Sequence, residues 1–194
     1  LNNQPQGIVQ HAFINHHQSH GATAYYTRPW ETSEDTVILT IDGLGENQSS
    51  CIYNHRLELI DEQIDPASIG RFYSLVTRIL GFKRLEEEYI VMGLSSYGKP
   101  TILHEFEYLW NNINQMTGTA RHKYLTNLLK TTSKEDMASS VQKFAEGKIL
   151  ERAKLARQYG SKLVYAGGVA QNIIANSLIK PLFDDMWVPP ACGD

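Results

Sequence analysis

The amino-acid sequence predicts an α/β fold in which long helices cover a β-sheet. Residues 36–42 and residues 162–166 have the apolar composition and the length of buried strands. Between them, apolar residues recur at intervals of three and four, which indicates amphipathic helices. Because strands and helices alternate along the chain, we expect the two strands to lie side by side in one sheet with helices packed on it.

Composition limits the class of protein. The 194 residues are 42% hydrophobic and 20% charged, which suits one good core or two small lobes. The formal net charge is −3 and no Lys or Arg precedes Arg28, so we expect no nucleic-acid partner. Two cysteines are too few for a disulfide framework, and the sequence shows no secretory signal and no apolar run of about 18 residues. These features predict a cytoplasmic protein without a membrane partner.

Histidines near the start of the chain form the first candidate site. Residues 7–14 are rich in apolar side chains and predict a short strand, which a helix follows. In that helix His16 and His20 are four residues apart on one face, and this spacing lets two imidazoles share one divalent metal. His17 would point elsewhere. The alternative is that the histidines only cap the helix and bond to one another through water.

The strand of residues 36–42 leads into a turn with two glycines. Asp42 ends the strand, Gly43 and Gly45 follow, and residues 48–53 predict a second strand. Glycines let backbone N–H groups approach an anion and a carboxylate can hold a cation, so this hairpin is a candidate site for a phosphate and its metal. The alternative is an ordinary hairpin, because Asp-Gly is a common turn dipeptide.

The middle of the chain is predicted to be mostly helical. We expect a third strand at residues 56–62 and then an amphipathic helix at residues 66–80. The acidic residues 86–88 favour the start of another helix, and residues 101–130 contain further helical patches. The longest helix is expected at residues 133–160, where the first four residues resemble a capping box.

A second glycine turn follows the longest helix. Lys162–Ala166 predicts a strand, Gly167 and Gly168 a tight turn, and residues 169–179 a helix. Backbone N–H groups at the start of such a helix can hold a phosphate, so this turn is a second candidate nucleotide site. A short closing strand is expected at residues 186–190.

Five segments occur together in a recognisable order. They are His16-His17-Gln18-Ser19-His20, residues 39–46, residues 88–94 with Tyr97-Gly98, residues 166–172 and residues 187–194. In this order they resemble the O-carbamoyltransferases of the nodulation-protein (NodU) type and of the type that carbamoylates cephamycin and tobramycin. The resemblance covers nearly the whole chain. The sequence departs from the family pattern at Asn15, where an acidic residue is common, and at Ile90, where a Lys is usual.

The resemblance implies both a fold and a reaction. The fold is the ribonuclease H-like, ATP-binding fold of actin, hexokinase and heat-shock chaperones, present here in part. In this family a YrdC-like domain makes carbamoyl adenylate from carbamoyl phosphate and ATP. The chaperone-like domain transfers the carbamoyl group to a hydroxyl of a sugar, a Nod factor or an antibiotic scaffold. The alternatives are a tRNA threonylcarbamoyl-adenosine-type transferase, which the missing basic patch disfavours, and a nucleotide-binding fragment without turnover.

The resemblance also implies the residues of the site. The metal, expected to be iron(II), would be held by His16, His20, Asp42 and Asp194. The glycine turn on the side of the ATP or carbamoyl adenylate would contain Gly167, Gly168 and Asn172. The hairpin glycines Gly43 and Gly45 complete the expected nucleotide site, and the catalytic base is not assigned.

Both ends of the chain resemble cuts through a longer protein. The sequence starts at Leu1 without an initiator Met and stops at Asp194 without a polar tail. We therefore expect residues 1–194 to be a single fragment of the chaperone-like domain, without its first strands and without the YrdC-like domain. Such a fragment would hold its ligand from one side only and would not transfer a carbamoyl group by itself.

Overall fold

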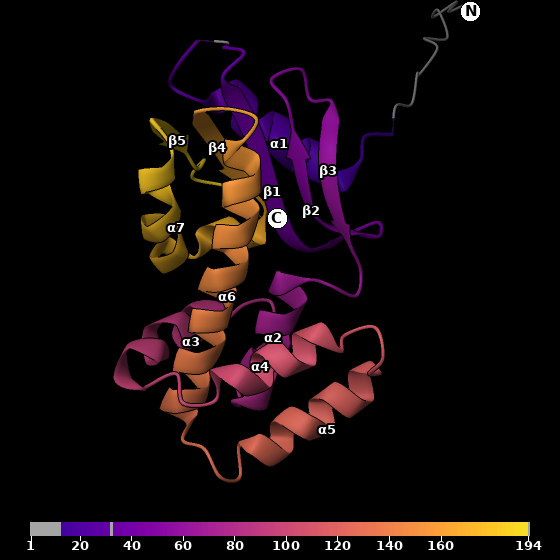
Figure 1. Ribbon diagram of the computed structural model, residues 1–194, viewed down its shortest axis with the longest axis vertical. Coiled ribbons are helices and arrows are strands. Elements are labelled where there is room, and N and C mark those ends of the chain that lie inside the picture. Colours follow the sequence, from indigo (N-terminus) through magenta and orange to yellow (C-terminus); the bar gives the residue numbers. More distant parts are fainter. Residues whose placement is uncertain (1–12, 32, 194) are drawn as a thin grey trace, which may run out of the picture.

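The computed structural model describes residues 13–31 and 33–193. Figure 1 shows a β-sheet with its covering helices at one end of the molecule and a group of helices at the other. Helix α6 (Lys134–Arg157) extends through both parts. Most of the strand predicted at residues 7–14 lies outside the described residues, and Phe13 and Ile14 belong to neither a helix nor a strand.

The sheet has five strands in the order β3-β2-β1-β4-β5. They are β1 (Thr36–Gly45), β2 (Gln48–Tyr53), β3 (Leu59–Ile64), β4 (Lys162–Ala166) and β5 (Asp185–Trp187). The β1–β2 and β2–β3 pairs are antiparallel, whereas the β1–β4 and β4–β5 pairs are parallel, so β2 alone runs against the others. The predicted α/β fold, with residues 36–42 beside Lys162–Ala166, is confirmed.

Several strand boundaries differ from the prediction. Strand β1 continues past Asp42 to Gly45, and two of the other differences have local reasons. The third strand begins at Leu59 because the side chain of Asn54 accepts hydrogen bonds from the backbone N–H groups of Arg56 and Glu58 and closes a turn there. The closing strand ends at Trp187, before two prolines that have no N–H group to donate to a neighbouring strand.

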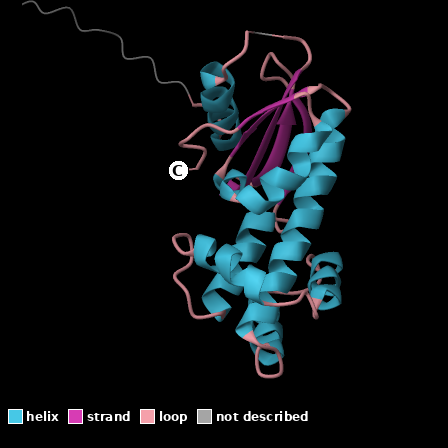
Figure 2. Cartoon of the chain, turned by 90° about the vertical axis from the view of Figure 1, so that its left-hand side faces the viewer, coloured by secondary structure: helices cyan, strands magenta, loops and turns pink. Residues whose placement is uncertain are grey.

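Strand β1 is buried on both faces, as its composition predicts. Its odd-numbered side chains, such as Leu39 and Ile41, join the large core formed with α2 (Ile69–Ile79) and α6. Its even-numbered side chains face α1 (His16–Thr27), where Ile38 packs with Ala24 and Tyr25. Figure 2 shows α1 on one side of the sheet and the other covering helices on the opposite side. Because side chains alternate along a strand, Asp42 lies on the α1 side.

The remaining helices lie in the predicted helical middle of the chain and after β4. They are α3 (Glu88–Leu94), α4 (Leu103–Asn111), α5 (Gly118–Leu128) and α7 (Ile173–Ile179), with the short 3₁₀ helices η1 (Ser95–Tyr97), η2 (Gly168–Gln171) and η3 (Lys180–Leu182). Ser133 caps α6 by accepting from the N–H group of Asp136, which is half of the expected capping box. The carboxylate of Asp136 accepts instead from Lys99 and Thr101, and so anchors the segment before α4.

The prediction of one continuous helix at residues 169–179 is wrong. The 3₁₀ helix η2 ends at Gln171, and α7 begins at Ile173. Asn172 lies between them with a non-helical backbone, and its side chain accepts a hydrogen bond from the N–H group of Ala175. Asn172 therefore caps a new helix. Among the described residues, no helix combines the length and the apolar character needed to cross a membrane.

Candidate functional site

Two histidines of α1 and the carboxylate near the end of β1 form a compact cluster. The Nε2 atoms of His16 and His20 lie 3.3 Å and 2.9 Å from Oδ2 of Asp42, and 3.2 Å from each other. Atoms bound to one ion at about 2.1 Å lie about 3 to 3.4 Å apart in octahedral or tetrahedral geometry. Two imidazoles and one carboxylate therefore have both the chemistry and the spacing to hold a transition metal.

The start of α1 is fixed by the β1–β2 hairpin. Asn15 caps the helix by accepting from the N–H group of Gln18, and its own amide donates to Glu46 at 3.0 Å. The N–H group of His16 also donates to the carboxylate of Glu46, at 3.3 Å. A carboxylate at a helix N-terminus is favoured by the helix dipole. These contacts orient His16 toward Asp42 before any metal binds.

Gly45 lies against the histidine cluster. A Cβ atom at Gly45 would lie 2.4 Å from the ring atom Cδ2 of His16, closer than atoms can approach. The absent side chain therefore makes room for the imidazole of His16. The structure places Gly45 beside this ring and not in the wall of the cavity described below.

His17 points away from the other two histidines and into the sheet. It is fully buried, with Nε2 at 3.0 Å from the carbonyl oxygen of Gln48 and Nδ1 at 2.9 Å from the hydroxyl of Thr40. A carbonyl can only accept, so Nε2 carries the proton and Nδ1 accepts from Thr40. Burial lowers the pKa of His17, which keeps the ring neutral.

Asp42 is held as a carboxylate. Burial alone would raise its pKa, but hydrogen bonds from His20 and from the N–H groups of Gly43 and Gly168 outweigh burial and hold the pKa well below its usual range. The N–H group of Gly43 donates to Oδ1 at 2.5 Å. Two of the backbone donors predicted to hold a phosphate, those of Gly43 and Gly168, are thus engaged by Asp42. They leave Oδ2 to the histidines and keep a negative charge where a cation would lie.

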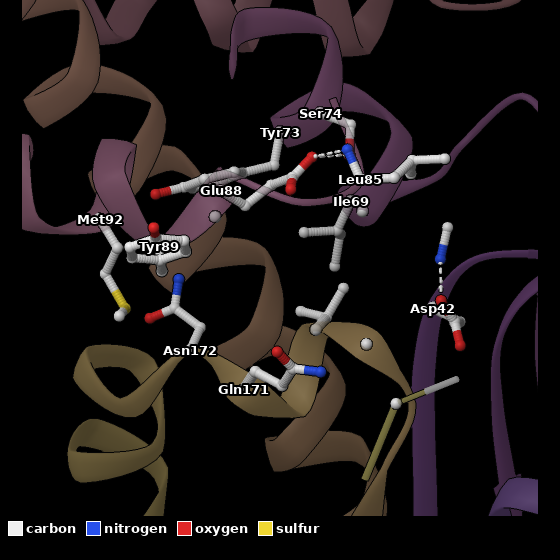
Figure 3. A pocket seen from close by; sticks show the side chains of 16 residues that line it. Asp42, Ile69, Tyr73, Ser74, Leu85, Glu88, Tyr89, Met92, Gln171 and Asn172 are labelled. Atoms are coloured by element: carbon white, nitrogen blue, oxygen red, sulfur yellow. Dashed lines mark hydrogen bonds between the residues drawn. The ribbon is translucent and has the colours of Figure 1, made fainter. Parts of the chain in front are cut away.

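A cavity of about 380 Å³ adjoins the cluster. Figure 3 shows Asp42 on one side of it and Asn172, with Tyr89 and Met92 of α3, on the other. Gly43 and Gly168 also line the cavity, as predicted for a nucleotide site, and the adjoining wall is formed by the first turns of α2. The cavity thus lies between the sheet and the helical part of the molecule.

Gly167 shapes the cavity without lining it. Its φ of +91° is in the region that favours glycine, and a Cβ atom there would lie 2.3 Å from the carbonyl oxygen of Ile41. Its N–H group donates to Cys192 at 2.7 Å. Gly167 therefore lets the end of β4 pass close to β1, which brings Gly168 beside Asp42.

The polar network behind Asn172 was missed by the sequence analysis. The amides of Asn172 and Gln142 exchange two hydrogen bonds, of 3.0 and 3.1 Å, and the hydroxyl of Tyr73 donates to Gln142 at 3.0 Å. Gln142 is only 3% exposed. A polar residue on the buried face of a predicted amphipathic helix is the one signal that could have indicated it. The network fixes the amide of Asn172 at the cavity wall.

Two further positions complete the comparison with the expected site. Glu88 also lines the cavity, and its carboxylate accepts from the hydroxyl of Ser74 at 2.6 Å and from the N–H group of Leu85 at 2.8 Å. Asp194, the fourth predicted metal ligand, lies outside the described residues. Its neighbour Gly193 lines the same cavity as Asp42.

Comparison with known proteins identifies relatives of this chain. The family described as "Carbamoyltransferase N-terminus" matches residues 6–194. An uncharacterized protein of Methanocaldococcus jannaschii is 28% identical over 92% of this chain and 34% of its own length. The nodulation protein NolO of Bradyrhizobium diazoefficiens is 28% identical over 93% of the chain and 36% of its own length. The nodulation protein NolNO of Sinorhizobium fredii is 27% identical over 94% of this chain and 29% of its own length. The chain thus spans about a third of the length of these relatives.

Proposed function

The chain belongs to the carbamoyltransferase N-terminus family, and on that premise we propose that it is part of an O-carbamoyltransferase. The proposed reaction transfers a carbamoyl group from carbamoyl adenylate to a hydroxyl of a small-molecule acceptor. The observation that carries this proposal is the convergence of His16, His20 and Asp42 at the edge of the 380 Å³ cavity. Of these three residues Asp42 also lines the cavity, so a cation held by them would supply positive charge at its edge.

The fold supports the proposal. A mixed five-stranded sheet with helices on both faces and with β2 alone reversed is compatible with the ribonuclease H-like fold of the actin, hexokinase and chaperone class. We assign the chain to this fold as a single fragment of the chaperone-like domain. A YrdC-like domain elsewhere in the full-length protein would supply carbamoyl adenylate, and a cytoplasmic location belongs to the same proposal.

Each side chain has a proposed role. His16, His20 and Asp42 would hold a divalent metal, with Asp194 as a fourth ligand, and two imidazoles with a carboxylate suit iron(II). The metal would supply Lewis acidity toward a phosphate or carbonyl oxygen. The N–H groups of Gly43 and Gly168 keep Asp42 ionised and oriented.

The cavity would hold the nucleotide portion of the ligand. Tyr89 and Met92 give one wall apolar surface on which a base can pack. The oxygen of the Asn172 amide already accepts from Gln142 and Ala175, but the amide keeps one N–H that can donate to a ligand. Because the N–H groups of Gly43 and Gly168 bind Asp42 and that of Gly167 binds Cys192, the phosphate would be held mainly through the cation. This differs from a site in which a glycine loop binds the phosphate directly.

The test uses the full-length protein that contains this chain. The protein is supplied with carbamoyl phosphate, ATP and iron(II), together with a panel of aminoglycoside and sugar acceptors, and mass spectrometry detects acceptors that gain one carbamoyl group. We expect transfer that is lost when His20 is replaced by Ala and kept when the exposed His104 is replaced by Ala. Transfer that is unchanged in His20→Ala would contradict the proposed role of the cluster.

A further inference from the structure

A second, smaller cavity of about 160 Å³ lies on the other face of α2. Ser68, Arg71 and Leu75 line it, whereas Gly70 and Tyr73 line the first cavity. At 100° per residue these two sets point to opposite faces of one helix. The rest of the second cavity is formed by the segment between α2 and α3 and by the start of α5.

Three of the side chains that line this cavity are arginines from three different segments. They are Arg71 of α2, Arg84 of the following loop and Arg121 of α5. Arg71 pairs with the carboxylate of Asp65. Within residues 13–31 and 33–193, neither Arg84 nor Arg121 has a carboxylate within ion-pair distance. The arginines around the cavity thus exceed the carboxylates paired with them by two.

Arg121 provides an independent sign that something is missing from this cavity. Its Nε atom is buried and meets no hydrogen-bond acceptor in the described part of the chain. Burial and the nearby positive charge of Arg71 lower the pKa of Arg121, and the negative charge of Asp65 offsets this only in part. A buried charged donor without an acceptor is costly, and an acceptor brought by a ligand would remove that cost.

We propose that this cavity binds an oxyanion group, a phosphate or a carboxylate, of a small molecule. The planar fork of a guanidinium matches the paired oxygens of either group, and three arginines line this cavity. Gly118, the first residue of α5, adds the positive end of a helix dipole to the same wall. The volume suits one such group and is less than half that of the first cavity.

The site adjoins the candidate metal centre. A Cβ atom at Gly43 would lie 4.0 Å from Cγ of Arg71, so the stem of this arginine passes beside the turn that follows Asp42. A ligand bound to Arg71 would therefore contact the helix whose opposite face lines the first cavity. The inference stands on the arginines and the cavity and does not depend on the proposed carbamoyl transfer.

The test follows individual backbone amides by NMR. The ¹⁵N-labelled chain is titrated with sodium phosphate, and in a second arm with sodium acetate, at an ionic strength held constant with sodium chloride. We expect the Gly118 amide signal to shift and to saturate with at least one of the two anions, and the tighter of the two identifies the group. The Gly168 amide reports binding in the first cavity separately. A Gly118 signal that saturates with neither anion would overturn the proposal.

Matched substitutions locate the binding. Arg121→Gln and Arg84→Gln should each weaken the anion about ten-fold or more, since each removes a charge-assisted hydrogen bond. Arg78→Gln removes an exposed arginine of α2 that does not line the cavity, and it should leave the affinity unchanged. If Arg121→Gln fails to fold, the affinity of Arg84→Gln for the anion still tests the proposal, because Arg84 is exposed. Equal affinities in the wild type and Arg84→Gln would overturn the proposal.

Discussion

The histidine cluster and the cavity beside it are built in different ways. The cluster is small and partly buried. Without a metal, the backbone N–H group of His16 is bonded to Glu46 and the carboxylate of Asp42 accepts from the N–H group of Gly43. The helical wall of the cavity carries Tyr89 and Leu85, which are 66% and 71% exposed. The proposed metal ligands are thus positioned by residues of this chain itself, whereas the proposed nucleotide cavity has a wall whose large apolar side chains are exposed.

The largest expected effect is a loss of metal affinity when the histidine cluster loses its carboxylate. Asp42→Asn keeps the shape of the side chain but removes its charge, so we expect metal affinity to fall by more than about 100-fold, because even outer-shell changes cost about 10- to 100-fold. Competition with a chelator, followed by metal analysis, measures the change. Asp61→Asn is the control, because Asp61 is a carboxylate of the same sheet that pairs with Arg152. Equal losses in both variants would mean that Asp42 is not a ligand.

A pair of glycine substitutions separates the two regions. Gly45→Ala forces a Cβ atom into the ring of His16, so we expect a loss of about 1–3 kcal/mol of unfolding free energy and weaker metal binding. Gly43→Ala meets its nearest neighbour at 4.0 Å and should fold normally. Urea unfolding and chelator competition are measured on both. Normal metal binding by Gly45→Ala would show that the position of His16 is not essential.

A substitution behind the cavity should act on stability alone. Gln142→Leu leaves the amide of Asn172 and the hydroxyl of Tyr73 without their shared partner, so we expect a loss of about 1–3 kcal/mol in urea unfolding. Metal affinity should stay at its wild-type value, because none of these groups touches the cluster. A parallel fall in metal affinity would show that the cavity wall and the cluster are coupled.

The smallest effect concerns pH. The folded chain resists protonation of His17, whose pKa is lowered by burial, whereas in the unfolded chain the ring takes up a proton near its ordinary pKa of about 6.5. Stability should therefore fall as the pH decreases below about 6.5, by at most about 1.4 kcal/mol per pH unit for this one group. Urea unfolding of the metal-free chain between pH 5 and pH 8 measures the slope. His17→Gln should reduce it, and an unchanged slope would exclude His17 as the cause.

The sequence predicts those features that local patterns determine. The apolar strands, the amphipathic helices and the spacing of His16 and His20 all follow from intervals of two to four residues. Asp42 could be placed because it follows directly on a run of apolar residues typical of a buried strand, although the strand itself continues to Gly45. Local patterns therefore predict both the α/β layers and the candidate ligands.

Other features depend on contacts between distant parts of the chain. Gln142 and Asn172 are 30 residues apart and meet only after α6 packs against α7. The helix break at Asn172 was missed because its capping bond prevails over an apolar pattern that favours a continuous helix. Whether a glycine N–H group faces an anion or a neighbouring carboxylate is also set by packing, and no periodicity in the sequence shows it.

The continuity of α6 has a consequence for how the chain unfolds. This helix of 24 residues is about 36 Å long; its first half packs among the helices of one end of the molecule and its second half against the sheet. The buried stripe of α6 extends over both halves, so unfolding of either partner group would expose part of one continuous helix. The sheet and the helical group should therefore melt in one cooperative transition, with the slowest amide exchange along the middle turns of α6.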